Sequence, residues 1–253
     1  MKSFVASALS VLLTASQLFA QAVAAPTTAP VQQQDPTVPA IKYDKDGVTP
    51  NAGFMKAHGR FLEVAKKGGV DLLFLGDSIT AGWAKNGADV WAKRYESRNA
   101  ANFGIGGDRT QHVLWRVENG ELEGIKPKVI VLMIGTNNSA HNEADAIAEG
   151  VTKIVKTARD KTGAKVLLLG VFPRGATPEK ATTQRARITR VNEVIAKLDD
   201  GKNVRYLDLK GKFVQPDGTI SKDIMPDALH LSPEGYKIWA DAMEPLLKEM
   251  LAQ

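Results

Sequence analysis

The stretch VIVLMIGTNN, residues 129–138, decides the fold class of this chain. Six apolar residues in succession, four of them β-branched, lead directly into Gly135 and a polar tripeptide. A strand that is apolar on both faces is typical of a parallel sheet that is covered by helices on both sides. The stretch therefore predicts a buried parallel strand with a polar loop at its carboxyl end.

Four further apolar runs recur at intervals of roughly thirty residues, the size of one βαβ unit. They occupy residues 70–75, 100–103, 166–172 and 204–207. Apolar residues at helical spacing predict helices over 144–158 and 188–198, and Ser232-Pro233-Glu234 predicts the start of a last helix. This alternation predicts an α/β fold, a three-layer α/β/α sandwich with a five-stranded parallel sheet.

The first forty residues carry signals for export. Lys2 precedes a short apolar stretch, and an Ala-Val-Ala sequence ending at Ala24 has the pattern of a signal peptidase site. We therefore expect residues 1–24 to be a signal peptide, with no stable membrane anchor after cleavage. Residues 25–40 contain four prolines and predict a flexible tether. A single domain over 41–253 follows, in a secreted or periplasmic protein.

Composition excludes several classes of function. Among the 253 residues there is no cysteine, which removes disulfides, thiolate zinc sites and a thiol nucleophile. The 33 basic and 28 acidic residues give a net charge of only +5, without a basic block. This balance argues against a nucleic-acid partner.

Polar residues gather in the loops that follow the predicted strands. Ligands of open parallel sheets bind outside these carboxyl ends. The segments are GDSIT at 76–80, GIGGD at 104–108 and GTNN at 135–138, joined by DALHL at 227–231 before the last helix. Each segment alone suits a turn or a helix cap. Their joint occurrence, in chain order, predicts one functional site.

Two other chemistries fit these loops poorly. A dinucleotide site fails because Arg109 stands where the third glycine of its motif belongs, and no Gly-Lys-Ser/Thr of a phosphate-binding loop occurs. His58, His112 and His141 lie in scattered contexts without the spacing of metal ligands. We expect these histidines on helix surfaces or solvated loops, and no metal at the site.

Acyl transfer suits the loop residues better. It needs a nucleophile, a base, an orienting acid and donors aimed at a developing oxyanion. Ser78 is the candidate nucleophile, His230 the base and Asp227 the orienting acid. The backbone amides of Ser78 and Gly107 and the side-chain amide of Asn137 are candidate donors. The chain lacks the Gly-x-Ser-x-Gly elbow at this serine, which disfavours an α/β-hydrolase of the lipase type.

The four segments resemble the signature blocks of the SGNH (GDSL) hydrolase family, which fall here on Ser78, Gly107, Asn137 and His230. The resemblance implies a flavodoxin-like sheet, no cofactor, and ester hydrolysis through an acyl-serine. It also implies that Ser78, Gly107 and Asn137 form the oxyanion hole, while Asp227 and His230 complete the triad.

A closer resemblance is to the catalytic subunits of the intracellular platelet-activating factor acetylhydrolases, over residues 102–138 and in FPRG at 172–175. It implies an acetyl preference and a homodimer as a candidate assembly. Those enzymes are intracellular, whereas this chain has a predicted export signal. The resemblance therefore implies an acetyl preference more strongly than a phospholipid substrate.

Three hypotheses for the function follow. The first is a secreted esterase that removes short acyl groups, acetyl above all, from carbohydrates, with Trp83 as the candidate surface for a sugar ring. The second is a platelet-activating-factor-like lipid or broad aryl acetylhydrolase. The third is a non-catalytic carbohydrate-binding domain, which the presence of Ser78, Asn137 and His230 disfavours.

Overall fold

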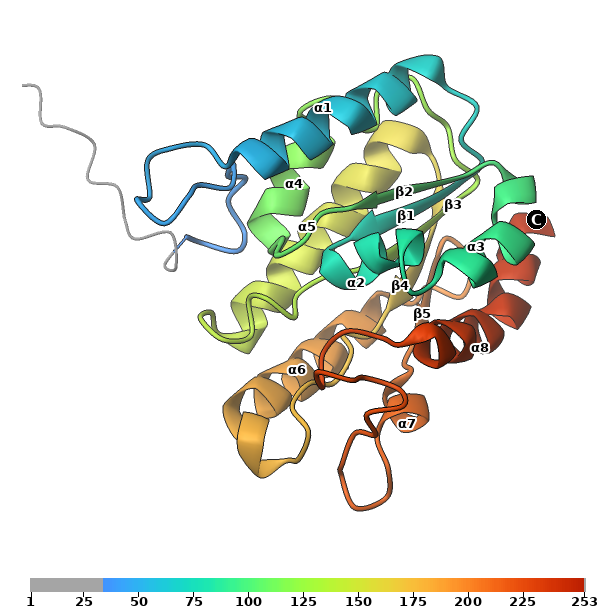
Figure 1. Ribbon diagram of the computed structural model, residues 1–253. Helices are drawn as coiled ribbons and strands as arrows, with labels where there is room; N and C mark the ends of the chain where they lie inside the picture. The colour runs from blue at the N-terminus through green and yellow to red at the C-terminus, as the bar shows by residue number, and fades with distance from the viewer. Residues whose placement is uncertain (1–33, 253) are drawn as a thin grey trace, which may run out of the picture.

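The computed structural model describes residues 34–252, and a five-stranded, all-parallel sheet forms its centre (Figure 1). The strand order is β2-β1-β3-β4-β5. The strands are β1 (Leu72–Gly76), β2 (Ala100–Gly104), β3 (Val129–Met133), β4 (Lys165–Leu169) and β5 (Val204–Leu207). Each lies within or at the edge of an apolar run, so the predicted parallel α/β sheet is confirmed.

Helices cover both faces of the sheet, which gives the predicted three layers (Figure 1). One face packs against α1 (Ala52–Lys67), α4 (Thr110–Glu118), α5 (Ala144–Thr162) and α6 (Thr182–Ile195). The other packs against α2 (Ser78–Ala81), α3 (Ala88–Arg94), α7 (Lys210–Phe213) and α8 (Pro233–Ala252). Short 3-10 helices are η2 (Gly82–Ala84), η3 (Glu96–Arg98), η4 (Glu179–Ala181) and η5 (Ala196–Leu198).

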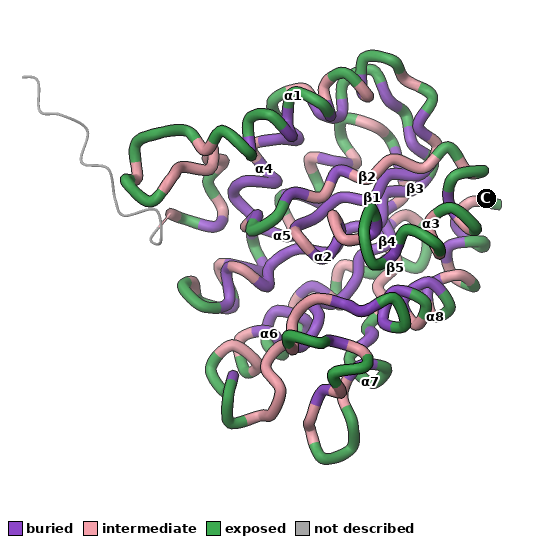
Figure 2. Tube along the Cα trace, in the orientation of Figure 1, coloured by how far each residue is buried: buried purple, intermediate pink, exposed green. Residues whose placement is uncertain are grey.

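Alternation along each strand feeds two separate cores. In β1, Leu73 and Leu75 pack in the core beneath α1, α4, α5 and α6, whereas Leu72 and Phe74 pack in the core beneath α8. All four side chains are fully buried, and β1 and β3 are buried along their whole length (Figure 2). This two-sided burial is the physical reason for the unbroken apolar runs.

The strand order places a crevice at the carboxyl ends of β1 and β3. After β1, the chain adds β2 along one edge of β1, and it then returns to add β3 along the opposite edge of β1. The loops after β1 and β3 therefore leave in different directions, which is where open α/β sheets bind ligands. The register pairs Gly76 with both Gly104 and Met133, so β1, β2 and β3 end side by side.

Residues 34–40, the last part of the predicted tether, lie against α4 and α5. Thr110 Oγ1 donates to the carbonyl oxygen of Pro36 at 2.8 Å. The backbone N–H of Ala40 donates to the carbonyl oxygen of Gln111 at 3.1 Å. The predicted signal peptide and the rest of the tether lie outside the described residues, so the domain boundaries stay a prediction. Between residues 34 and 252, no helix has both the length and the apolar character needed to cross a membrane.

Trp83 lies in an aromatic cluster between the sheet and α8. Its side chain is fully buried, with ring centroids 4.6 to 5.8 Å from those of Phe74, Tyr95, Tyr236 and Trp239. A ring without exposed surface cannot stack on a sugar. The expected substrate-binding role of Trp83 is therefore wrong, because tertiary packing encloses the short helical turn that carries it.

Replacing Trp83 should affect stability according to the size of the cavity that remains. Trp83→Ala should lower the free energy of unfolding by about 3–5 kcal/mol, as large-to-small changes in aromatic cores do. Trp83→Phe should cost much less, because the indole Nε1 has no hydrogen-bond partner within residues 34–252. Denaturant unfolding of both variants measures this, and an alanine variant as stable as the wild type would contradict the burial.

Candidate active site

Ser78, His230 and Asp227 form a continuous chain of hydrogen bonds. Ser78 Oγ lies 2.9 Å from His230 Nε2, and His230 Nδ1 lies 2.6 Å from Asp227 Oδ2. Ser78 begins α2, directly after β1, whereas the other two residues lie in the loop before α8. The fold thus joins a hydroxyl, an imidazole and a carboxylate in the order that nucleophilic catalysis needs.

The loop that carries His230 is shaped by Asp227. Asp227 Oδ1 accepts hydrogen bonds from the backbone N–H groups of Leu229 and His230, at 3.0 and 2.7 Å, while Ala228 adopts a left-handed backbone with φ 56°. Burial alone would raise the pKa of Asp227, but the hydrogen bonds and charge of His230 outweigh it and hold that pKa below its ordinary value. Asp227 is therefore ionised at neutral pH and can stabilise an imidazolium.

Asp77 sets the conformation of the residue that follows it. Its side chain caps α2, since Oδ1 accepts the backbone N–H of Ile79 at 2.9 Å. The same residue is tied to α8, where the hydroxyl of Tyr236 donates to the carbonyl oxygen of Ile79 at 2.5 Å. The residue that follows Ser78 is thus fixed through both its N–H and its carbonyl group.

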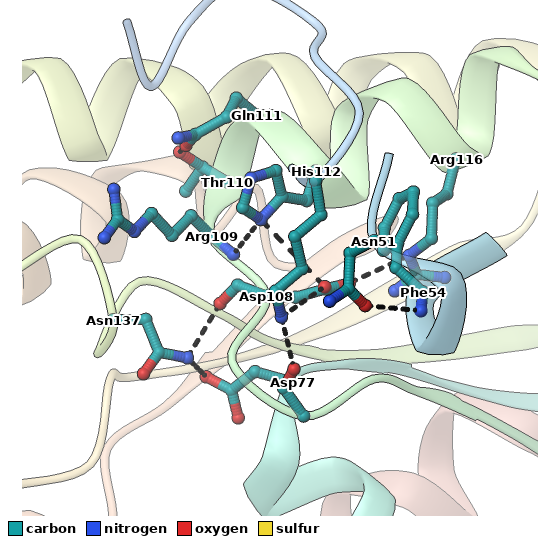
Figure 3. Close-up of polar contacts among 12 residues, drawn as sticks. Asn51, Phe54, Asp77, Asp108, Arg109, Thr110, Gln111, His112, Arg116 and Asn137 are labelled. Atoms are coloured by element: carbon teal, nitrogen blue, oxygen red, sulfur yellow. Dashed lines mark hydrogen bonds and ion pairs between the residues drawn. The ribbon is translucent and has the colours of Figure 1, made fainter. Parts of the chain in front are cut away.

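Asn137 and Gly107, the other two predicted donors, flank the same edge of the sheet. Asn137 Nδ2 donates to the backbone carbonyl of Asp108 at 2.8 Å and lies 3.5 Å from Asp77 Oδ2, as Figure 3 shows. Gly107 precedes Asp108 and has φ +72°, a left-handed conformation that suits glycine. The structure therefore brings the loops after β1, β2 and β3 together around Ser78.

A pocket of about 390 Å³ opens beside Ser78 and His230. Small residues, a leucine, a tyrosine and several polar side chains line it. The lining residues are Ser78, Ala81, Gly82, Lys85, Asn86, Gly106, His230, Leu231 and Tyr236. Ser78 and His230 thus line a cavity of the size of a small ester.

A buried network of charges adjoins Asn137, whose side chain contacts Asp77 and Asp108 (Figure 3). Arg116 Nε donates to Asp108 Oδ2 at 2.9 Å, Arg116 also pairs with Glu121, and Glu121 binds His58 Nδ1 at 2.9 Å. All of these side chains are buried, as is His112. The expectation that His58 and His112 lie on a surface or in a solvated loop is therefore wrong, because partners far away in the sequence cover them.

Burial changes the protonation of this network. It raises the pKa of Asp77 to about 7 and that of Asp108 to about 6, in the latter case against the opposing charges of Arg116 and Lys42. For His112, burial and the neighbouring cations lower the pKa to about 3. His112 is consequently a neutral ring, and its Nδ1 accepts the backbone N–H of Arg109 at 3.1 Å.

The histidines do not gather into a metal centre. His141 is exposed, as expected, while His58 and His112 contact different partners. Within residues 34–252, no three side chains of His, Asp or Glu converge as metal ligands.

A parallel α/β sheet with a Ser-His-Asp chain at its carboxyl edge has the geometry of a hydrolase that transfers acyl groups through a serine. The chain belongs to the GDSL-like lipase/acylhydrolase family, whose model matches residues 74–238. The resemblance predicted from the four sequence segments is thereby confirmed, and so is the prediction of an enzyme.

The chain is similar to individual proteins in sequence or in fold. Platelet-activating factor acetylhydrolase IB subunit alpha2 of Rattus norvegicus is 37% identical over 224 residues, covering 88% of this chain and 96% of the relative. A GDSL-like lipase from Bacteroides thetaiotaomicron has a TM-score of 0.63 at 18% identity, covering 78% of this chain and 98% of that structure. The acetyl xylan esterase AlAXEase has a TM-score of 0.58 at 24% identity, covering 70% of this chain and 98% of that structure.

Three residues of the site were not assigned a role from the sequence. Asp77 could have been identified as a helix cap, because an acidic residue directly precedes the first helical position. Asp108 could have been noted as the polar end of a glycine-rich loop. No local signal marks Lys42, whose Nζ donates to the carbonyl oxygen of Gly106 at 2.5 Å from a segment 64 residues away.

Asp77 should make stability fall as pH rises from about 4 to about 7. Its pKa is raised from 3.8 to about 7 by burial, so the folded protein keeps a proton there that the unfolded chain has lost. Below the pKa values of both the unfolded and the folded state, Asp77 carries a proton in both, and the free energy of unfolding is not lowered. Above the folded-state pKa, the loss in the free energy of unfolding is complete. Asp77→Asn keeps the capping oxygen without the charge.

Urea unfolding at several pH values tests this expectation. The stability of wild type relative to Asp77→Asn should decrease across that pH window, whereas the exposed Asp89→Asn should leave the wild-type pH dependence unchanged. A constant difference between wild type and Asp77→Asn would show that Asp77 does not titrate there.

Proposed function

We propose that this protein is an exported serine esterase that removes short acyl groups, acetyl above all, from carbohydrates through an acyl-serine intermediate. The observation that carries the proposal is the unbroken chain from Ser78 Oγ through His230 to Asp227, at the wall of an open pocket. The family membership supports the reaction class, and the site geometry supports the roles of the individual residues.

In the first step, His230 Nε2 accepts the proton of Ser78 Oγ while Oγ attacks the carbonyl carbon of the ester. The carbonyl π electrons move to oxygen, and this oxyanion would be stabilised by the backbone N–H groups of Ser78 and Gly107 and by Asn137 Nδ2. Collapse of the intermediate breaks the bond to the alcohol oxygen, which takes the proton from His230. The alcohol leaves and the acyl group stays on Ser78.

In the second step, water replaces the alcohol. His230 removes a proton from water, the resulting nucleophile attacks the acyl carbon, and Ser78 Oγ leaves with the proton from His230. Asp227 stabilises the imidazolium in both steps because its lowered pKa keeps it ionised. The free acid and the resting enzyme are restored.

The pocket supports a short acyl group. A Cβ atom at Gly82 would lie 2.0 Å from the hydroxyl of Tyr236, so the floor between these residues is closed. Tyr236 is itself fixed by its bond to Ile79. The name of the 37% identical relative, an acetylhydrolase, agrees with this limit.

The alcohol half is inferred from the open side of the site. The side chains of His230 and Asp227 are 43% and 56% exposed, and Lys85 and Asn86 give the pocket a polar rim, which suits a hydroxyl-rich leaving group. The predicted export signal supports a carbohydrate substrate, because an exported enzyme would meet polysaccharides outside the cytoplasm. A platelet-activating-factor-like lipid is the second candidate, favoured by the 37% identical relative; the homodimer also stays a prediction.

Ser78→Ala and His230→Ala should each remove nearly all turnover of 4-nitrophenyl acetate. The double variant should lose little more than either single one, because nucleophile and base act as a unit. The exposed Ser97→Ala and His141→Ala are the matched controls and should keep wild-type rates. Strictly additive losses in kcat would contradict a shared nucleophile and base.

Acetate release from acetylated xylo-oligosaccharides, with Ser78→Ala alongside, tests the substrate class. We expect release by the wild type and none by the variant, at a higher kcat/KM than for a 2-acetyl glycerophospholipid in micelles. A preference for the lipid would overturn the carbohydrate assignment and establish the second candidate. Turnover of the aryl acetate alone would reject both natural substrates while retaining the serine mechanism.

A further inference from the structure

We propose that Lys42, in the segment before α1, is a positioning residue for the oxyanion donor at Gly107; this inference rests on the proposed acyl-serine mechanism. Lys42 Nζ donates a hydrogen bond to the carbonyl oxygen of Gly106 at 2.5 Å. That carbonyl and the N–H of Gly107 belong to one peptide unit. Gly106 also lines the pocket beside Ser78 and His230.

The geometry of a peptide unit connects Lys42 to the donor. The unit is planar, and in the trans form its C=O and N–H point in opposite directions. A cation that fixes the carbonyl of Gly106 on one side therefore fixes the N–H of Gly107 on the other. The same contact draws electron density toward the carbonyl oxygen and makes the N–H a stronger donor, because linked hydrogen bonds polarise one another.

This peptide unit particularly needs a restraint. Glycine flanks it on both sides, so rotation of the whole unit meets no Cβ atom, and a rotated unit would turn its carbonyl oxygen toward the oxyanion. Gly107 has φ +72°, in the left-handed region. An added Cβ at Gly107 would lie 2.9 Å from Lys42 Nζ, which shows how closely the ammonium group covers this unit.

The backbone around Lys42 is fixed on both sides. The N–H of Asn51 donates to the carbonyl oxygen of Lys42 at 2.8 Å, and Asn51 Oδ1 caps α1 by accepting the N–H of Phe54 at 2.9 Å. Two residues before Lys42, the N–H of Ala40 donates to Gln111 in α4 at 3.1 Å. The ammonium group is therefore delivered from a fixed position.

Asp108 holds the charge of Lys42 in place. Its buried Oδ1 lies 3.8 Å from Lys42 Nζ, while Arg116 binds the other carboxylate oxygen. The backbone carbonyl of Asp108 accepts Asn137 Nδ2. Both predicted donors, Gly107 through Lys42 and Asn137 directly, are thus oriented by contacts that meet at Asp108.

Lys42→Met tests the inference, because methionine keeps the unbranched shape and removes the charge. We expect kcat for 4-nitrophenyl acetate to fall roughly tenfold, less than the ~100-fold typical of deleting an oxyanion donor, with KM unchanged. The affinity of a trifluoromethyl ketone, which adds to Ser78 Oγ and leaves an oxyanion, should fall by the same factor. Lys45→Met, an exposed lysine of the same segment, is the matched control.

Restoring the ammonium group provides the second test. The chain has no cysteine, so Lys42→Cys introduces a single thiol that 2-bromoethylamine converts to a thioether analogue of lysine with the same number of side-chain atoms. Wild type treated in the same way controls for other reactions. We expect the alkylated protein to recover both kcat and ketone affinity.

Four results would overturn the inference. They are an unchanged kcat in Lys42→Met, a loss of kcat without a matching loss of ketone affinity, failure of alkylation to restore both, and a loss of kcat that only follows a lower unfolding temperature. Ser78→Ala in the same assay separates the two levels of the argument. If that variant keeps wild-type turnover, the acyl-serine mechanism itself fails, whatever Lys42 does.

Discussion

The close approach of α2 to the ends of β1 and β2 is the constraint on which the site depends. A Cβ at Gly76 would lie 2.2 Å from Thr80 Oγ1, and one at Gly104 would lie 2.2 Å from the backbone nitrogen of Ala81. With glycine at both positions, the first turn of α2 rests directly on the edge of the sheet. Ser78 is thereby held at the edge of the sheet, where it meets His230 from the loop between α7 and α8, 152 residues later.

Buried charges stabilise the same edge from behind, at a desolvation cost that only pairing offsets. Arg116 illustrates this balance: it is fully buried, binds Asp108 and Glu121, and donates to the carbonyl oxygens of Gly76 and Phe103. One guanidinium thus joins α4 to the ends of both β1 and β2. Removing Arg116 would be strongly destabilising, because two buried carboxylates would lose their main counter-charge.

The sequence predicted the sheet, and it also located segments that the structure brings together at one edge, because these features are local. A strand covered on both faces must be apolar throughout, and a loop at its carboxyl end is found simply by following the strand. The environment of single side chains could not be predicted in this way. The burial of Trp83 depends on α8, and that of His58 on a carboxylate 63 residues away. Lys42 acts through a backbone carbonyl, which no side-chain pattern reveals.

The site has a buried half and an open half, and the two suit different tasks. Stabilising an oxyanion requires donors that are already oriented, and Asn137 and Gly107 lie against the buried network around Asp108. His230 must take a proton from one oxygen and give it to another, and it lies on an exposed loop shaped by Asp227. In the proposed mechanism, the alcohol enters and leaves on that open side. Changes at Lys85 and Asn86, which line the pocket, would therefore alter the alcohol that is accepted without touching the buried network.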